Sequence, residues 1–309
     1  MIQTKSSAAL LSVFSNALLI ALKLAAAAIT GSIAILTEAI HSSIDLMASF
    51  IALISVRRAD VPPDEDHPYG HEKAENLAAT IEGMLILVGA GIIIFEATRR
   101  LVLGSEVESL GVGIAVIGFS AVVNLAVSGL LGRRAESLAS AALEGDAAHL
   151  RADAYTSLGV LAGLLLVEIT DEPAFDAIAA LVVAVVIVFS GVRIMLRSGS
   201  VLMDEAPPPE ELDRIEATIS AARPPEMLGY HKLRARRAGA RRWIDLHVQF
   251  KAGTSLERAH EAAHELRDAI RADLPQSDVL IHVEPESSHR ELGDSPLRHS
   301  TAAENPPDD

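Results

Sequence analysis

The stretch His41-Ser-Ser-Ile-Asp45 and its repeat His149-Leu-Arg-Ala-Asp153 decide how the chain is organised. Each lies in a long apolar segment and places an imidazole and a carboxylate four residues apart, on one face of a helix. Ionisable side chains are costly at membrane depth, so they are candidates for a functional site. If the two helices face each other, two nitrogens and two oxygens meet at one point, which is a donor set that zinc prefers. The sequence therefore predicts an intramembrane metal site.

A simpler interpretation exists for either pair alone. A histidine in a helix is usually packed or hydrogen-bonded, and Asp153 could form an ion pair with Arg151, which is close to it in sequence. The second pair repeats the spacing and the order of the first, which favours one shared metal site.

Composition separates the chain into an apolar and a polar part. Of the 309 residues, 50% are hydrophobic and 22% are charged, and the last third is the polar part. This segregation predicts a membrane domain followed by a soluble domain. The chain has no cysteine, so any metal site must use histidines and carboxylates. The net charge of -15 argues against binding of nucleic acid.

Six apolar segments are long enough to span a bilayer, which takes about 20 residues of helix. They cover residues 8–29, 33–56, 76–98, 111–131, 146–168 and 175–196. The N-terminal stretch Met1-Ile-Gln-Thr-Lys-Ser-Ser7 is not typical of a signal peptide, so the first segment is expected to remain as a helix.

The distribution of Lys and Arg predicts the orientation. With the N-terminus in the cytoplasm, the external loops carry only Arg99 and Arg100. The cytoplasmic ends carry the other flanking bases, which are Lys5, Arg57, Arg58, Lys73, Arg133, Arg134, Arg193 and Arg197. This excess predicts a multi-pass protein of the cell (inner or plasma) membrane with both termini in the cytoplasm.

The loop from Val61 to His71 holds a second group of possible ligands. Asp64, His67 and His71 follow the spacing D-x-x-H-x-x-x-H, so three donors lie within eight residues. They could bind one metal ion. The alternative is a solvated acidic loop, and the spacing alone does not separate the two.

The composition changes after Arg197. We expect a transport domain over residues 1–200, a proline-rich linker over 201–209, a folded domain over 210–286 and a disordered tail over 287–309. Within the folded domain, helical periodicity covers 210–222 and 256–272, and strand patterns cover 231–238, 242–251 and 279–284. The order α-β-β-α-β predicts a small α+β fold with the helices on one face of a sheet.

Several histidines fall in this folded domain. His247 lies on the polar face of its predicted strand, and His282 and Glu284 share one face of theirs. A single surface histidine is usually inert, but several in one small acidic domain indicate a metal site. His264 and His289 are left out of that prediction.

With these motifs in hand, residues 5–288 resemble the cation diffusion facilitators. The motifs are HSSID, HLRADA, D-x-x-H-P-Y-G-H-x-K-A-E in the loop, and H-x-L-R-x-R with I-x-H-x-E-P near the C-terminus. The resemblance implies a homodimer with six transmembrane helices per subunit and a cytoplasmic domain of ferredoxin-like (metallochaperone-like) fold. It also implies proton-coupled export of zinc and related divalent ions.

The resemblance assigns three metal sites. It places the transport site on His41, Asp45, His149 and Asp153. It places a second site on Asp64, His67 and His71. It places a binuclear cytoplasmic site, with zinc as a regulatory ion, on His231, His247, His260, His282 and Glu284. Members of the family often have Asp where this chain has Glu284, so the side chain here is longer by one methylene.

Two histidines and two aspartates favour zinc as the substrate and also admit cobalt and cadmium, whereas an Asp in place of His41 would suit iron or manganese. Neither a catalytic nucleophile nor a G-x-x-x-x-G-K-[ST] phosphate loop is present, so we expect neither an enzyme nor a prosthetic group. The alternatives are an exporter preferring Fe²⁺, Co²⁺, Cd²⁺ or Mn²⁺, a membrane metal sensor that does not transport, and an exporter of organic cations. The last would favour aromatic residues, and the chain is only 4% aromatic.

Overall fold

The computed structural model describes residues 4–30, 33–103, 111–170, 172 and 174–287. Inside these ranges a few helical side chains, among them that of His41, lie outside what is described. The tail predicted over 287–309 lies outside it as well, apart from its first residue. The chain divides into two compact units, Met1–Leu202 and Met203–Asp309.

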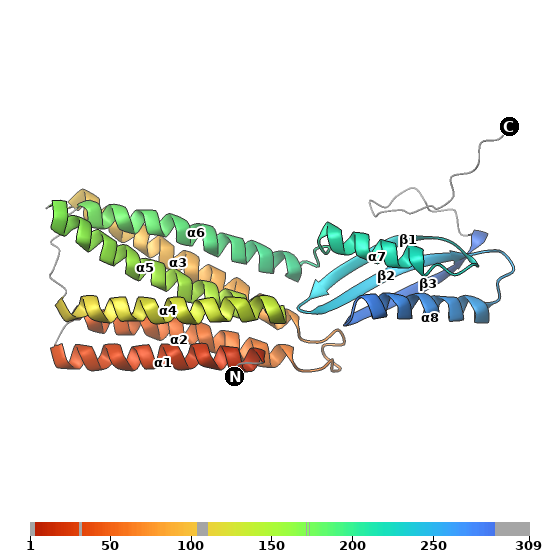
Figure 1. Ribbon diagram of the computed structural model, residues 1–309, viewed down its shortest axis with the longest axis horizontal. Coiled ribbons are helices and arrows are strands. Elements are labelled where there is room, and N and C mark those ends of the chain that lie inside the picture. Colours follow the sequence, from red (N-terminus) through yellow and green to blue (C-terminus); the bar gives the residue numbers. More distant parts are fainter. Residues whose placement is uncertain (1–3, 31–32, 104–110, 171, 173, 288–309) are drawn as a thin grey trace, which may run out of the picture. The chain divides into compact units, whose positions relative to one another are not determined.

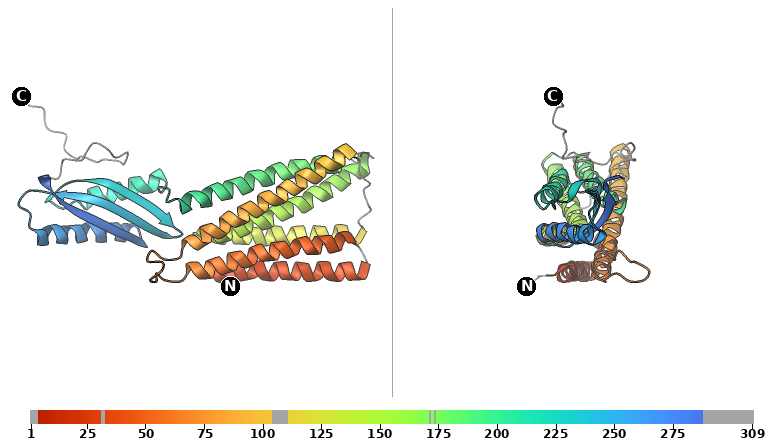
Figure 2. Two further views of the ribbon diagram at one scale, coloured as in Figure 1. Left: turned by 180° about the vertical axis from the view of Figure 1, so that it is seen from behind. Right: turned by 90° about the vertical axis from the view of Figure 1, so that its right-hand side faces the viewer.

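The first unit is helical (Figures 1 and 2). Helices α3 and α6, α4 and α5, and α1 and α2 pack side by side, and α5 also packs against α2 and α3. The six helices are α1 (Lys5–Thr30), α2 (Ile33–Ala59), α3 (Lys73–Leu103), α4 (Gly111–Leu138), α5 (Ala141–Thr170) and α6 (Ala174–Leu202).

Five of these helices, α1, α3, α4, α5 and α6, are long and apolar enough to cross a membrane, judged over the described residues. The prediction of six spans is supported for these five. The predicted segment 33–56 does form a helix, α2, but it is not among the five, and it carries Asp45, Arg57 and Arg58. Helix α5 begins at Ala141, whereas the fifth apolar segment was predicted to begin at residue 146. The predicted start is therefore too late.

The interior of this unit is built from small side chains. Buried positions are rich in alanine, whereas large apolar side chains such as Phe14, Phe95 and Phe189 are exposed on its outside. Small residues let membrane helices approach closely, and exposed phenylalanines suit contact with lipid. Ala8, Ala52, Ala79, Ala90, Ala142, Ala148 and Ala152 are examples of the buried alanines.

The second unit is the predicted α+β domain. Its elements are α7 (Pro209–Ala221), β1 (Met227–Ala238), β2 (Arg241–Phe250), α8 (Leu256–Asp273) and β3 (Ser277–Pro285). The sheet order is β1-β2-β3, with β1 antiparallel and β3 parallel to β2. Alternate residues of β2 are buried with the apolar faces of α7 and α8, in a core that includes Ile215, Ile219, Ile244, Leu246, Val248, Leu266 and Ile270. The other face of β2 is therefore free to carry polar side chains.

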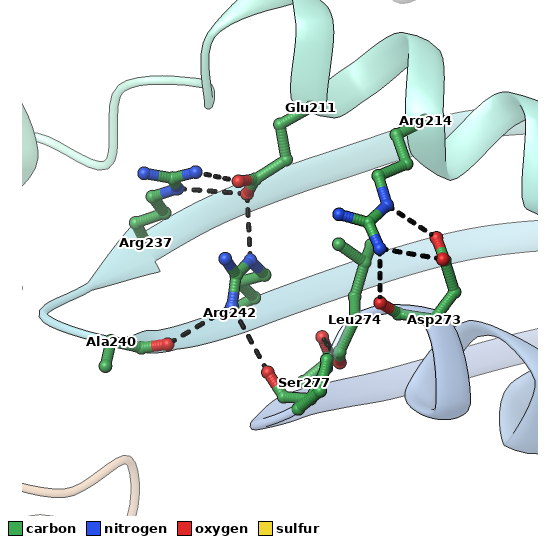
Figure 3. Close-up of polar contacts among 9 residues, drawn as sticks. Glu211, Arg214, Arg237, Ala240, Arg242, Asp273, Leu274 and Ser277 are labelled. Carbon is green, nitrogen blue, oxygen red and sulfur yellow. Dashed lines mark hydrogen bonds and ion pairs between the residues drawn. The ribbon is translucent and has the colours of Figure 1, made fainter.

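Ion pairs join the helices of this unit to each other and to the sheet (Figure 3). Glu211, in the first turn of α7, accepts hydrogen bonds from Arg237 of β1 and Arg242 of β2. Arg214 of α7 donates to both carboxylate oxygens of Asp273 at the end of α8, at 2.8 and 2.9 Å. These contacts hold both helices in position on the buried face of the sheet.

Candidate metal sites

The first group of ligands lies between α2 and α5. Nε2 of His149 is 3.3 Å from Oδ1 of Asp45 and 3.9 Å from Oδ2 of Asp153. Asp45 and His149 are buried, and the donor atoms of all three residues lie within 4.8 Å of one another. Two carboxylates around one imidazole give a compact set of oxygen and nitrogen donors for a divalent cation.

His41 is the fourth predicted member, and its side chain is not among those described. The backbone of α2 is helical from Ile33, so His41 lies one turn before Asp45 on the same helix face. Its neighbour Ser42 is buried and accepts a hydrogen bond of 2.7 Å from Nζ of Lys23 in α1. Lys23 is a buried base within an apolar helix and was not among the predicted site residues.

Local sequence explains why α5 presents this face. The backbone of α5 runs without a break through Glu144, Gly145 and Asp146, after Ser140 accepts a hydrogen bond from the N–H of Leu143. Ala148 and Ala152 pack in a cluster with residues of α3 and α6. The positions one residue further along, His149 and Asp153, consequently point to a different side of α5, where Asp45 of α2 meets His149.

A buried polar network lies beside this group. Ser49 of α2 donates to Oδ1 of Asp146 in α5 at 3.0 Å, and Asn16 of α1 donates to Ser49 at 2.7 Å. The hydroxyl of Ser12 is 3.0 Å from that of Ser49. The sequence does not predict the network, because Asp146 stands at the beginning of the apolar segment 146–168 and is not part of a ligand pair. Its distance of three residues from His149 was the signal that could have placed it on a neighbouring face.

The loop residues also come together. The backbone N–H of His67 donates to Oδ1 of Asp64 at 2.7 Å, and Nε2 of His71 is 3.3 Å from Oδ2 of Asp64. The rings of His67 and His71 are 4.5 Å apart, and Gly70 allows the turn between them with a φ of 91°. The hydrogen bond from the backbone N–H of His67 is the main cause that lowers the pKa of Asp64, so its carboxylate is ionised and suited to binding a cation.

In the second unit, strand register brings three histidines into one row. His231 of β1 is the register partner of His247 of β2, which in turn is the partner of His282 of β3. The register of β1 shifts directly after His231, where Lys232 has a φ of 51°. Such a bulge changes the direction of the side chains next to it.

Glu284 completes the group from the same face of β3. Its Oε1 is 2.6 Å from Nδ1 of His247, and its Oε2 is 3.3 Å from Nε2 of His231. His282 is more exposed, with its ring 4.6 Å from that of His247 and its Nε2 3.8 Å from Oε1 of Glu284. The structure thus collects His231, His247 and Glu284 into a three-donor group and places His282 at its edge.

His260 is not brought to this group. It lies on α8, where its ring is 4.2 Å from that of His264. Both residues are exposed, and α8 covers the buried face of the sheet. The neighbour of His260 is thus His264, a residue that was left out of the predicted metal site.

Comparison with known proteins identifies the family. Residues 9–203 match the cation efflux transmembrane domain, and residues 207–286 match the cytoplasmic domain of cation efflux proteins. An uncharacterised transporter of Synechocystis sp. is 33% identical over 279 residues, which are 90% of this chain and 89% of the relative. The cation-efflux pump FieF of Klebsiella pneumoniae is 33% identical over 258 residues, which are 84% of this chain and 85% of the pump. A solved structure of CzrB in its zinc form is 37% identical over 28% of this chain and 98% of its own, with a TM-score of 0.27.

A membrane domain of apolar helices that buries carboxylates around a histidine, followed by an α+β domain, defines a cation efflux transporter. The chain belongs to the cation diffusion facilitator family. The resemblance found in the sequence is confirmed: the protein is a multi-pass membrane transporter that exports divalent metal cations, and it is not an enzyme. The assignment of residues 207–286 also supports a dimer formed through the cytoplasmic domain.

Proposed function

We propose that this transporter exports zinc from the cytoplasm in exchange for protons, through a site made of His41, Asp45, His149 and Asp153. The observation that carries the proposal is the approach of Nε2 of His149 to Oδ1 of Asp45, 3.3 Å across two helices. The relatives known as cation-efflux pumps support the direction of transport.

The donor chemistry favours zinc. Zinc binds imidazole nitrogen and carboxylate oxygen in tetrahedral geometry, and two of each complete its coordination without water. Harder ions such as manganese prefer sites with more oxygen donors. Iron, cobalt and cadmium are the competing substrates, and the transport assay below compares them directly.

The exchange with protons follows from the ligands. Metal binding requires neutral imidazole and ionised carboxylate, so zinc displaces protons when it enters from the cytoplasm. When the site opens to the other side, protons compete with zinc for the imidazole nitrogens. A protonated imidazole is no longer a ligand and repels the cation, so zinc leaves and protons are carried inward.

The loop and cytoplasmic groups have a separate role in this proposal. His231, His247 and Glu284 offer two nitrogens and a carboxylate within 4.8 Å, a donor set that fits zinc. We infer that zinc held there is regulatory and strengthens the homodimer when cytoplasmic zinc is abundant. Asp64, His67 and His71 form a second peripheral group at the loop between α2 and α3. Both termini are placed in the cytoplasm, as the Lys and Arg distribution indicates.

Zinc flux into proteoliposomes under an imposed pH gradient tests the proposal, with wild type beside Asp153→Ala. We expect flux only from the wild type, at a rate that follows the gradient. If cobalt, cadmium or iron is carried faster than zinc, the assignment of the substrate is wrong. If both proteins bind zinc and neither carries it, the protein is a membrane metal sensor and the proposal is wrong.

A further inference from the structure

Glu82 of α3 is a carboxylate in the middle of a helix bundle. Its side chain is 0% exposed, and neither carboxylate oxygen has a hydrogen-bond partner among the described residues. It lies opposite Gly145 of α5, where any side chain would overlap Oε2 of Glu82. Because Gly145 has no side chain, there is room at this position for the carboxyl group of Glu82.

A second buried carboxylate is next to it. Asp146 follows Gly145 in α5, is 0% exposed and interacts electrostatically with Glu82. Its Oδ1 accepts a hydrogen bond from Ser49, whereas its Oδ2 has no partner within the part of the chain that the structure describes. One oxygen of Asp146 and both of Glu82 are therefore available to accept a proton.

The neighbouring helices give this pair of acids no Lys or Arg partner among the described residues. On α3 the nearest acid toward the cytoplasm is Glu75, which is already paired with Lys5 and with the hydroxyl of Ser140. From α6, the packed side chains in this region are apolar, Ile187 and Ile194. On α5, Asp146 also interacts electrostatically with His149, the imidazole that lies beside Asp45 and Asp153. Among the described residues, Glu82 and Asp146 form no ion pair with Lys or Arg.

Two buried carboxylates that lack a Lys or Arg partner are too costly to be ionised together, because each repels the other and both have lost their water. We propose that one of the two acids, Glu82 or Asp146, carries an exchangeable proton and that this pair is a proton site of the transporter, separate from the metal ligands. The proposal rests on the proposed function, since the proton it describes is one that zinc displaces.

The position of Asp146 explains the coupling. Asp146 precedes His149 by three residues on α5, so the pair is about one helical turn from the metal ligands. A divalent cation at His149 favours the ionised form of a nearby acid, and the pair then releases its proton. When zinc binds, the carboxylic acid releases one proton to water. When zinc leaves, the carboxylate takes one proton up again.

A proton fits this pair better than a second metal ion does. Glu82 and Asp146 do not belong to any of the three groups of three or more donors found among the described residues. A pair of carboxylates without imidazole, in a space closed by Gly145 and Ala79, lacks the ligands that zinc requires.

The test counts the protons released per zinc bound to full-length protein. A background carrying His67→Ala and His247→Ala weakens the loop and cytoplasmic groups, and titration calorimetry in two buffers of different ionisation enthalpy gives the proton number. In this background, Glu82→Gln has nearly the same shape but cannot hold a proton. We expect it to release about one proton fewer per zinc at neutral pH, and Asp146→Asn to have the same effect.

The matched control is Glu96→Gln. Glu96 lies on the same helix, but it is exposed and paired with Arg99 and Arg100, so its replacement should leave the proton number unchanged. A zinc-induced infrared difference spectrum gives a second readout. The absorption of a protonated carboxylic acid should decrease on zinc addition in the background protein and show no such change in Glu82→Gln.

The outcomes separate the two proposals. If Glu82→Gln binds zinc and releases as many protons as the background, the proton site is wrong while the transport site stands. If zinc binding in the background is not abolished by Asp153→Ala, the transport site is wrong and the proton site falls with it. Size-exclusion chromatography shows that each variant is folded, and Glu82→Asp, which keeps the acid, should restore the proton count.

Discussion

The imidazole of His149 and the carboxylate of Asp45 lie 3.3 Å apart, Nε2 to Oδ1, although 104 positions separate the two residues in the chain. This contact joins α2 to α5, and Asp153 adds a further ligand one turn along α5. The donors converge only while the two helices keep this register. A displacement of either helix by one turn, about 5.4 Å, would separate them and release a bound cation.

Replacing His149 by Ala should reduce zinc flux into proteoliposomes by at least ~100-fold, because two carboxylates without the imidazole between them bind zinc poorly. Arg151→Gln is the control. Arg151 is exposed, whereas Oδ2 of Asp153 lies 3.9 Å from Nε2 of His149. If Arg151→Gln were as damaging as His149→Ala, the ion-pair interpretation of Asp153 would be correct.

Shortening Glu284 to Asp should weaken zinc binding to the cytoplasmic group by about tenfold. Oε1 of Glu284 lies 2.6 Å from Nδ1 of His247, and Oε2 lies 3.3 Å from Nε2 of His231. The shorter side chain of Asp would move both oxygens away from these nitrogens. Zinc titration of full-length protein that carries Asp153→Ala and His67→Ala isolates this site. Unchanged affinity in Glu284→Asp would show that the carboxylate does not bind the metal.

Asp273→Asn should lower the stability of the cytoplasmic domain at neutral pH. Hydrogen bonds from Arg214, and next from Thr218, hold the pKa of Asp273 below its ordinary value of 3.8. A lowered pKa means that the ionised form stabilises the fold above the unfolded-state pKa and that this contribution disappears as the pH falls through the folded-state pKa. The difference from wild type should therefore be full above about pH 5, decrease as the pH falls past 3.8, and disappear only below the lowered folded-state pKa.

Trp243 is the only tryptophan and lies in β2, so its fluorescence reports on this domain during denaturant unfolding of the full chain. Asp268→Asn is the control, because Asp268 is an exposed acid on the same helix that pairs with its neighbour Arg267. A loss of stability that persists unchanged at acidic pH would contradict the assignment to the Arg214–Asp273 pair.

Gly145→Ala should destabilise the membrane domain by about 1–3 kcal/mol, the usual cost of an added methyl group in a packed interior. The new methyl would overlap Oε2 of Glu82 and lie 3.1 Å from Cα of Ala79. In a Glu82→Ala background the first overlap is removed, so the same substitution should cost less. Thermal unfolding in detergent measures both, and strictly additive effects would show that the two positions do not contact each other.

Much of the cytoplasmic domain was predictable because its signals are local. Alternation of Ile244, Leu246 and Val248 with polar residues identifies β2, and the Gly239 turn separates it from β1. The row of His231, His247 and His282 was only partly predictable, because strand register depends on pairing that spacing does not encode. The position of His260 on the opposite side of the domain follows from the packing of α8, which the periodicity of one helix cannot show.

In the membrane domain, the sequence predicted the pairs Asp45 with His41 and His149 with Asp153, since both rest on helical spacing. It did not predict Glu82 or Asp146 as neighbours. Glu82 lies between Glu75 and Glu96 in α3, and its partner lies on a different helix whose rotation is determined by packing. Nothing in the spacing of either segment reveals that Gly145 faces Glu82.

The alanine-rich interior of the membrane domain has a consequence for the speed of transport. Interfaces between large side chains interlock, so helices that slide past each other must first separate or change rotamers. Contacts among alanines such as Ala90, Ala148 and Ala152 are nearly smooth, because a methyl group has no rotamers to rearrange. Shear at these positions would exchange one methyl contact for an equivalent one, so we expect these alanine contacts to add little to the activation barrier of the conformational cycle.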